Sequence, residues 1–256
     1  GANRDHVVFP SNIKVISSFA CNNLKLSSIV LQEGLTTING SAFSSNQLTS
    51  LTIPKTVTNL SGGAFSDNLL ADEDAFIYKR SKEGEDRSYL INYAGARKEN
   101  VVIPSNVETI GDSALSTTNL KSVTIPEGVK YIGQRAFYNN ELTSITIPSS
   151  VTHIGMGAFN TNKIPYDELA FIYQRRSDGS IDDTTLLSYA GAKTTNIVVP
   201  ENVTTIADGA FSYTYIESIS LPSNLRTIGP SAFSNCNLST IVIPSTVTSI
   251  GKNAFY

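Results

Sequence analysis

The chain has 256 residues, a formal net charge of −3 at pH 7, 16% charged residues and 40% hydrophobic residues. Nucleic-acid-binding surfaces are normally basic, so this charge argues against nucleic acid as a partner. No apolar run approaches the roughly 18 residues that a membrane-spanning helix needs, so we expect no membrane span in this chain.

One motif returns along the chain at an interval of 22 residues. It reads LTSLTIPKTVTNLSGGAF at 48–65, and close copies stand at 120–137, 142–159 and 238–255. A unit repeated at a fixed period predicts a solenoid, in which each coil packs only against its neighbours. The proline of the motif, or Gln32 in its place, marks nine units: Pro10, Gln32, Pro54, Pro104, Pro126, Pro148, Pro200, Pro222 and Pro244.

The residues before each proline alternate between apolar and polar. In the third unit, Leu51 and Ile53 alternate with Ser50 and Thr52. This period of two predicts a short strand with one buried face and one small, polar face. Proline then ends the strand, because it has no N–H for a strand ladder.

A second short extended run follows the proline, as at Val129 and Ile132 in the fifth unit. Alanine comes next in all nine units, and phenylalanine follows it in seven of the nine. The exceptions in this column are Cys21 and Leu115. The pattern predicts that aliphatic and phenylalanine side chains stack into ladders along the core.

These units resemble the leucine-rich repeats of the BspA type (the Treponema-like subclass), whose consensus runs L-x-x-(I/V)-x-I-P-x-x-(V/L)-x-x-I-G-x-x-A-F. The resemblance covers nearly the whole chain outside two inserts. It implies a mostly β, right-handed solenoid of about nine 22-residue coils, forming one domain over residues 1–256. It also implies a bacterial protein that is secreted or displayed at the cell surface, with no catalytic residues and no cofactor. Several members of the family are adhesins, which implies a protein or glycan partner on host cells or other microbes without naming it.

Two inserts separate the three groups of three units, at about 67–98 and 161–194. Each contains two alternating runs around a charged turn with glycine, which predicts a β-hairpin. Both inserts share a Tyr-Ala-Gly-Ala segment, beginning at Tyr93 and at Tyr189, whereas their tips differ. We expect the shared parts to pack on the solenoid and the tips to face solvent, as neighbouring fingers on one side.

The tips are the candidate recognition sites, because loops on a regular scaffold often carry function. Tyrosine and arginine are the side chains most enriched at binding hot spots. The candidate partner-binding residues are Tyr78, Arg80, Arg87 and Tyr89 on the first insert, and Tyr173, Arg175 and Arg176 on the second.

Few other residues suggest chemistry. His6 and His153 are the only histidines, and His153 lies in a column predicted to be exposed strand surface. No Cys/His cluster has metal-ligand spacing, so the chain is not expected to be an enzyme or to hold a cofactor. The acidic runs 72–74 and 182–183 leave a weak calcium site open, although solvated loop carboxylates are the simpler interpretation.

Two structural predictions concern cysteine and asparagine. Cys21 and Cys236 lie in the first and eighth coils, too far apart for a disulfide, so we expect free thiols. Asparagines recur after the phenylalanine column, where turn hydrogen bonding is the expected reason. These are Asn46, Asn68, Asn139, Asn162 and Asn235.

Two functional hypotheses remain open from the sequence. The first is a secreted or surface-displayed adhesion module. The second is a structural spacer or stalk that presents another domain. The chain starts without methionine and ends inside a repeat, so we expect either a naturally truncated end or a segment cut from a longer surface protein.

Overall fold

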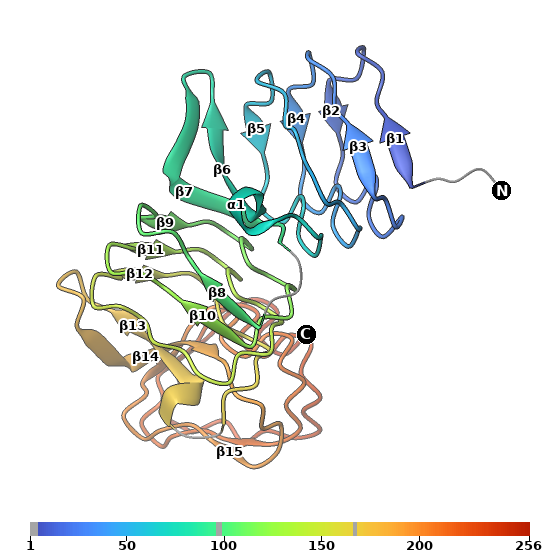
Figure 1. Ribbon diagram of the computed structural model, residues 1–256. Coiled ribbons are helices and arrows are strands. Elements are labelled where there is room, and N and C mark those ends of the chain that lie inside the picture. Colours follow the sequence, from blue (N-terminus) through green and yellow to red (C-terminus); the bar gives the residue numbers. More distant parts are fainter. Residues whose placement is uncertain (1–4, 96–98, 166–167) are drawn as a thin grey trace.

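The computed structural model describes residues 5–95, 99–165 and 168–256, and it is a β-solenoid of about eleven turns (Figure 1). The described residues contain little helix: a four-residue α1 (Asp72–Ala75) and a 3-10 helix, η1 (Glu168–Ala170). The predicted mostly β repeat fold is therefore confirmed. The expected end of the first insert, at residue 98, lies outside the described residues.

The strand after each proline position is two residues long and pairs in parallel with the same strand of a neighbouring coil. Ile38 lies in register between Ile16 and Leu60, so one column of side chains stacks on itself. Each strand is too short to be stable alone, and the ladder between coils holds it. These strands are β2 (Val15–Ile16), β4 (Thr37–Ile38), β5 (Asn59–Leu60), β9 (Thr109–Ile110), β11 (Tyr131–Ile132), β12 (His153–Ile154), β16 (Thr205–Ile206), β18 (Thr227–Ile228) and β19 (Ser249–Ile250).

The strands before the proline pair only between the first two coils of each group. Their outward face is not uniformly polar, because the side chains of Val102 and Val198 are 67% and 54% exposed. The prediction of a small, polar face is therefore wrong for these coils; β-branched residues favour extended backbone even where they face solvent. The strands are β1 (His6–Val8), β3 (Ser28–Val30), β8 (Asn100–Val102), β10 (Ser122–Thr124), β15 (Ile197–Val198) and β17 (Ile219–Ser220).

The predicted phenylalanine ladder lies in the core. The rings of Phe43 and Phe65 stack with centroids 5.3 Å apart and an interplanar angle of 5°. Phe137 and Phe159 stack at 5.1 Å and 4°. The alanine before each phenylalanine is small enough to let adjacent turns approach, and the Phe43 N–H donates to the carbonyl of Ala64 at 2.8 Å. Identical spacing in the sequence thus becomes identical contacts between coils.

Buried asparagines tie successive coils together at the turn beside this ladder. The Asn68 side chain accepts a hydrogen bond from the backbone N–H of Leu48 at 3.1 Å. It donates to the carbonyl oxygens of Phe43 and Phe65 at 3.0 and 2.8 Å. Each buried amide therefore satisfies backbone groups of two coils. Its several hydrogen bonds contribute more to the stability of the fold than a single hydrogen bond within a turn would. The same column contains Asn46, Asn140 and Asn162.

Two of the predicted asparagines do not belong to this column. Asn139 and Asn235 instead adopt left-handed backbone, with φ of 53° and 56°, a conformation that asparagine tolerates well. Cys236 occupies the asparagine column in the eighth coil, and its Sγ–H donates to the carbonyl of Phe211 at 3.1 Å. Cys21 and Cys236 are both free thiols.

Each insert contains the predicted antiparallel hairpin, but it also completes a turn of the solenoid. The first hairpin is β6 (Phe76–Ser81) and β7 (Gly84–Tyr93), and the second is β13 (Phe171–Arg175) and β14 (Ile181–Tyr189). Both returning strands pair in parallel with the next coil. The buried rings of Tyr93 and Tyr189 take the place of phenylalanine in the ladder, as their N–H groups donate to the carbonyls of Ala114 and Ala210. The two inserts therefore extend nine regular coils to about eleven turns.

These inserted turns are wedge-shaped. On the sheet side each contributes two strands, whereas on the turn side the flanking coils touch directly. Gly62 lies so close to the carbonyl oxygen of Asp112 that a Cβ at this position would overlap it. Across the second insert, the Asn160 side chain donates to the carbonyls of Gly209 and Ser212 at 2.9 and 3.0 Å. The solenoid changes direction at the first wedge, and Figure 1 shows β2, β4 and β5 running in a different direction from β9, β11 and β12.

The hairpin tips differ from the expectation of two neighbouring fingers. Because the solenoid turns between them, the tip of β6–β7 points up in Figure 1 while that of β13–β14 points to the left. Residues 81–87 of the first tip are exposed, as predicted. Gly179 of the second tip is buried against the backbone of Ser149, where its φ of +82° and the close approach both require glycine. The second tip therefore packs on the solenoid.

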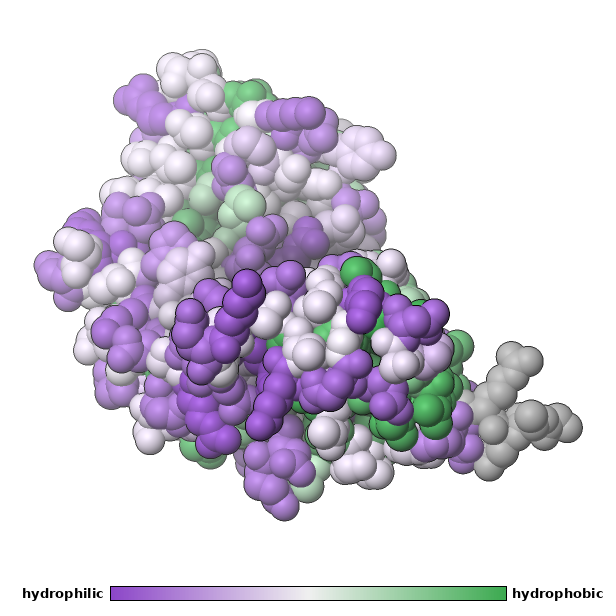
Figure 2. All heavy atoms as spheres, turned by 90° about the horizontal axis from the view of Figure 1, so that it is seen from above, coloured by the Kyte–Doolittle hydropathy of each residue, from purple (hydrophilic) through white to green (hydrophobic). Residues whose placement is uncertain are grey.

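The molecular surface near the first hairpin is mostly hydrophilic. Figure 2, seen from above, shows hydrophilic residues gathered there and a hydrophobic area beside the grey N-terminal residues. The first coil supplies exposed apolar side chains at that end, including Phe19 at 67% and Val8 at 56% exposure.

Candidate binding groove at the second hairpin

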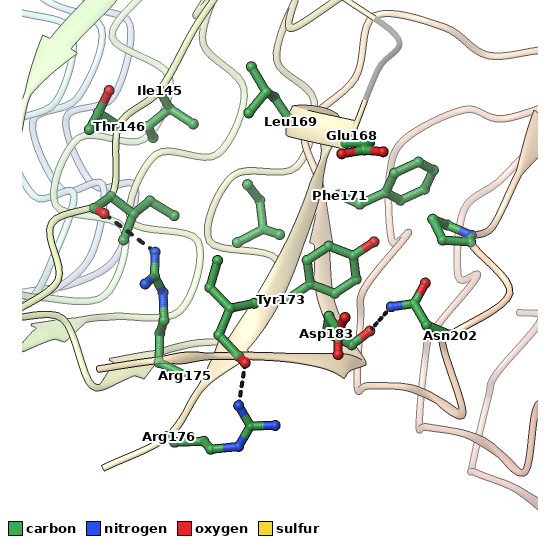
Figure 3. Close-up of a pocket in the computed structure, with 14 residues that line it drawn as sticks. Ile145, Thr146, Glu168, Leu169, Phe171, Tyr173, Arg175, Arg176, Asp183 and Asn202 are labelled. Carbon is green, nitrogen blue, oxygen red and sulfur yellow. Dashed lines mark hydrogen bonds between the residues drawn. The ribbon is translucent and has the colours of Figure 1, made fainter. Parts of the chain in front are cut away.

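An open groove of about 810 Å³ lies on the second hairpin. Figure 3 shows the hairpin residues in the middle, Ile145 and Thr146 on one side and Asn202 on the other. η1 closes one end, and the hairpin tip with Arg176 lies at the other. The lining residues are Ile145, Thr146, Ile147, Glu168, Leu169, Phe171, Ile172, Tyr173, Arg175, Arg176, Ile181, Asp183, Pro200 and Asn202.

The groove exists because the inserted turn has no strand before its proline position. The chain passes Ile164 and enters η1 and β13, so the pre-proline segments of the sixth and seventh coils have no strand of the same type between them. Leu169 and Ile181 are left 58% and 51% exposed along the groove. Exposed apolar side chains next to a concavity are typical of surfaces that bind other molecules.

Tyr173 lies half-buried in the groove, between two carboxylates. The pKa of its hydroxyl is raised to about 12, mainly by loss of hydration, and the negative charges of Asp183 and Glu168 contribute to this rise. Both carboxylates are on exposed residues, and neither makes an ion pair or hydrogen bond within the described parts of the chain. The Asn202 side chain binds the backbone carbonyl of Asp183, which fixes the position of this strand.

Both arginines of the groove bind the protein itself. Arg175 donates to the carbonyl of Gly179 at 2.9 Å and to that of Ile147 at 3.4 Å. Burial lowers the pKa of this guanidinium. Arg176 donates to the carbonyl of Ile181 and forms an ion pair with Asp182 at 3.6 Å. The two arginines therefore hold the tip in place, and the charge left open in the groove is negative.

The first hairpin has a different surface. The Arg87 guanidinium lies over the ring of Tyr78 at 5.7 Å, and Tyr78 is only 8% exposed. Lys79 lies over the ring of Tyr89 at 4.9 Å. Glu85 pairs with Arg80 at 3.7 Å and with Arg87 at 3.2 Å. These charges are neutralised within the hairpin.

The seven predicted site residues therefore separate into two groups. Tyr173, Arg175 and Arg176 line the groove, whereas Tyr78, Arg80, Arg87 and Tyr89 belong to the first hairpin. Sequence reasoning missed Leu169, Ile181, Glu168 and Asn202, and it named Asp183 only as part of a possible weak calcium site. The sequence did contain a signal for the two apolar residues. Leu169 and Ile181 are equivalent to Asp74 and Glu85 of the first insert, so two charged residues of one insert are apolar in the other.

The strand surface offers one other feature. His153 is exposed, as predicted, but its ring stacks on that of Tyr131 with centroids 4.3 Å apart and an interplanar angle of 12°. Among the described residues, no group of three or more His, Cys, Asp or Glu side chains is arranged to hold a metal ion. Within that same part of the chain, no helix has the length and hydrophobicity to cross a membrane.

The comparisons with known proteins agree with this repeat architecture. The family model described as "BspA type Leucine rich repeat region" matches six copies over residues 2–74, 92–170 and 184–256. The outer parts of both hairpins fall in the gaps between these matches. No curated relative matches the chain.

Two solved structures share the fold. A leucine-rich repeat protein from Eubacterium ventriosum is 23% identical, with a TM-score of 0.55, over 99% of this chain and 76% of that one. A leucine rich cell surface protein from Faecalibacterium prausnitzii is 20% identical, with a TM-score of 0.50, over 99% of this chain and 79% of that one.

Proposed function

Since the chain belongs to the BspA-type leucine-rich repeat family, we propose that it is a non-enzymatic module of a secreted or cell-surface protein that adheres to proteins of a host or of other microbes. The cell-surface description of the Faecalibacterium protein supports the location. The formal charge of −3 fits a protein partner better than a nucleic acid.

The observation that carries the proposal is the difference between the two hairpins. They share one backbone plan, yet the second exposes Leu169 and Ile181 in a groove where the first has Asp74 and Glu85. The stacking of coils does not depend on the side chains at these two positions, because in both hairpins they are exposed and point away from the core. Exposed apolar residues favour aggregation unless a partner covers them, so their presence in one copy supports a binding role.

A structural spacer is the second candidate. Both arginines of the first hairpin, Arg80 and Arg87, already pair with Glu85 of the same hairpin. These charged groups therefore do not require a binding partner. A spacer would also need only the regular ladders of the core. This candidate does not account for the groove of the second hairpin.

The test is binding to a panel of purified extracellular matrix and plasma proteins, measured on immobilised chain. The groove variant carries Leu169→Ser and Ile181→Ser. The matched control carries Val30→Ser and Val102→Ser, which remove exposed apolar side chains from the strand surface. Both variants are first checked for unchanged thermal unfolding.

We expect saturable binding to at least one panel protein, weakened about tenfold or more in the groove variant, since buried apolar anchors dominate interfaces. The control should bind as the unmodified chain does. Absence of binding across the panel, or equal binding by the groove variant, would favour the spacer.

A further inference from the structure

The two hairpins can be compared residue by residue, because their pairing is the same. Tyr78 lies opposite Leu90 in the first, and Tyr173 lies opposite Leu186 in the second. An asparagine of the next coil fixes each returning strand three residues before that leucine. Asn106 donates to the carbonyl of Arg87, and Asn202 donates to that of Asp183. Arg87 and Asp183 therefore occupy the same position.

In the first hairpin this position provides a cation. The Arg87 guanidinium lies 5.7 Å from the centroid of the Tyr78 ring, within the range of a cation–π contact. Glu85 holds the same guanidinium at 3.2 Å. An aromatic ring and a carboxylate thus receive an arginine of the chain itself, and the tyrosine is covered.

In the second hairpin the tyrosine is present, but the cation is missing and Ile181 stands where the first hairpin has Glu85. Two other carboxylates, Asp183 and Glu168, act on the Tyr173 hydroxyl. Asp183 replaces the arginine, and Tyr173 carries no cation over its ring among the described residues. Tyr173 remains partly exposed between Asp183 and Glu168. The arginines nearest to it, Arg175 and Arg176, are bound elsewhere.

The groove therefore combines three elements that match one kind of ligand. It has a tyrosine face, two carboxylates that pair with no side chain among the described residues, and apolar side chains at Leu169 and Ile181. A guanidinium is planar, stacks on an aromatic face and pairs with carboxylates, and it is weakly hydrated compared with an ammonium group. Neutral or acidic ligands would leave both carboxylates uncompensated.

We propose that the groove of the second hairpin binds an arginine side chain of a protein partner, in the position that Arg87 fills within the first hairpin. Aliphatic residues next to that arginine contact Leu169 and Ile181. The inference rests on the proposed adhesion function and specifies the chemistry of the partner.

The test uses a defined probe, the tripeptide acetyl-Leu-Arg-Leu-amide, titrated into ¹⁵N-labelled chain by NMR. The matched probe replaces arginine with citrulline, which keeps the shape and removes the charge. We expect saturable shift changes around Glu168, Tyr173 and Asp183, and a dissociation constant about tenfold higher for the citrulline peptide. Equal affinity of the two peptides would overturn the proposal.

Exchange of the equivalent residues gives a second arm. Asp183→Arg should place the chain's own guanidinium on Tyr173 and abolish probe binding. Arg87→Asp should uncover Tyr78 and add a second binding event at the first hairpin. Val102→Ser serves as the control and should bind as the unmodified chain does. Undiminished binding by a folded Asp183→Arg variant would overturn the proposal.

The two levels of the account can fail separately. If a panel protein needs Leu169 and Ile181 but arginine and citrulline peptides bind alike, the arginine inference is wrong and the adhesion proposal stands. If no panel protein binds the chain, the adhesion proposal fails whatever the peptides do.

Discussion

At the scale of single residues, the phenylalanine column is where sequence pattern and stability are most directly linked. Phe137 is fully buried and stacks on Phe159 at 5.1 Å. Changing Phe137 to alanine should lower the free energy of unfolding by about 3–5 kcal/mol, because it opens a cavity between coils. Chemical denaturation measures this directly.

The control for this change is His153→Ala on the exposed strand surface. Its loss removes only the stack on Tyr131, so the cost should stay within about 1 kcal/mol. Similar losses in the two variants would contradict the assignment of the core.

Buried tyrosines make stability depend on alkaline pH. Burial is the main cause that raises the pKa of Tyr93 from 10.0 to about 12, with Asp72 adding to it. The folded state thus keeps a proton that the unfolded state loses above pH 10, so this stability is complete below pH 10 and is lost as the pH rises towards 12. Tyr93→Phe should flatten the fall of the unfolding free energy over this range. An unchanged slope in that variant would exclude Tyr93 as its source.

At the scale of elements, the second hairpin is held by arginine–carbonyl hydrogen bonds that have no counterpart among the described residues of the first. Arg175 bonds to carbonyls of Gly179 and Ile147, so Arg175→Ala should cost about 1–3 kcal/mol of unfolding free energy. The equivalent change, Arg80→Ala, removes a partly exposed ion pair with Glu85 and should cost less than about 1 kcal/mol. Thermal or chemical unfolding of both variants checks the order. A larger loss from Arg80→Ala would contradict the view that the second tip is the one anchored to the solenoid.

The regular coils were predictable because each position repeats its contact at a constant interval. The inserted turns were not, since Tyr93 follows Leu90 by three positions whereas Leu115 follows Ile110 by five. Because of this shorter spacing, an alignment of the repeats does not place Tyr93 in the phenylalanine column. The tyrosine and arginines of the groove were predictable by residue type, but the way in which the surrounding segments come together to form the groove was not. The groove is formed by segments from three parts of the chain, near Ile145, Leu169 and Asn202, whose meeting depends on the wedge.

At the scale of the whole molecule, the solenoid changes direction at the first wedge. Gly62 lies at this wedge, where a side chain would overlap the carbonyl of Asp112. Gly62→Ala should therefore cost about 1–3 kcal/mol through forced separation of the two coils. Gly40 occupies the same column one coil earlier, and a Cβ there meets Gly62 O at 3.4 Å, an ordinary contact. Gly40→Ala should change stability by less than about 1 kcal/mol.

Unfolding measurements on these two variants test whether direct contact across the insert produces the bend. Equal tolerance of both substitutions would mean that the turn sides of the flanking coils are not in close contact. The wedge would then have to be explained by the hairpin strands alone.

The central claim is that a partner binds at the second wedge and not along the strand surface. Site-specific photo-cross-linking tests it most directly, with a photoreactive amino acid placed at Leu169, at the equivalent Asp74 of the first insert, or at Val102 on the strand surface. With the panel protein bound, we predict cross-links from position 169 and none from positions 74 or 102. Cross-links from position 102, with position 169 silent, would contradict the account.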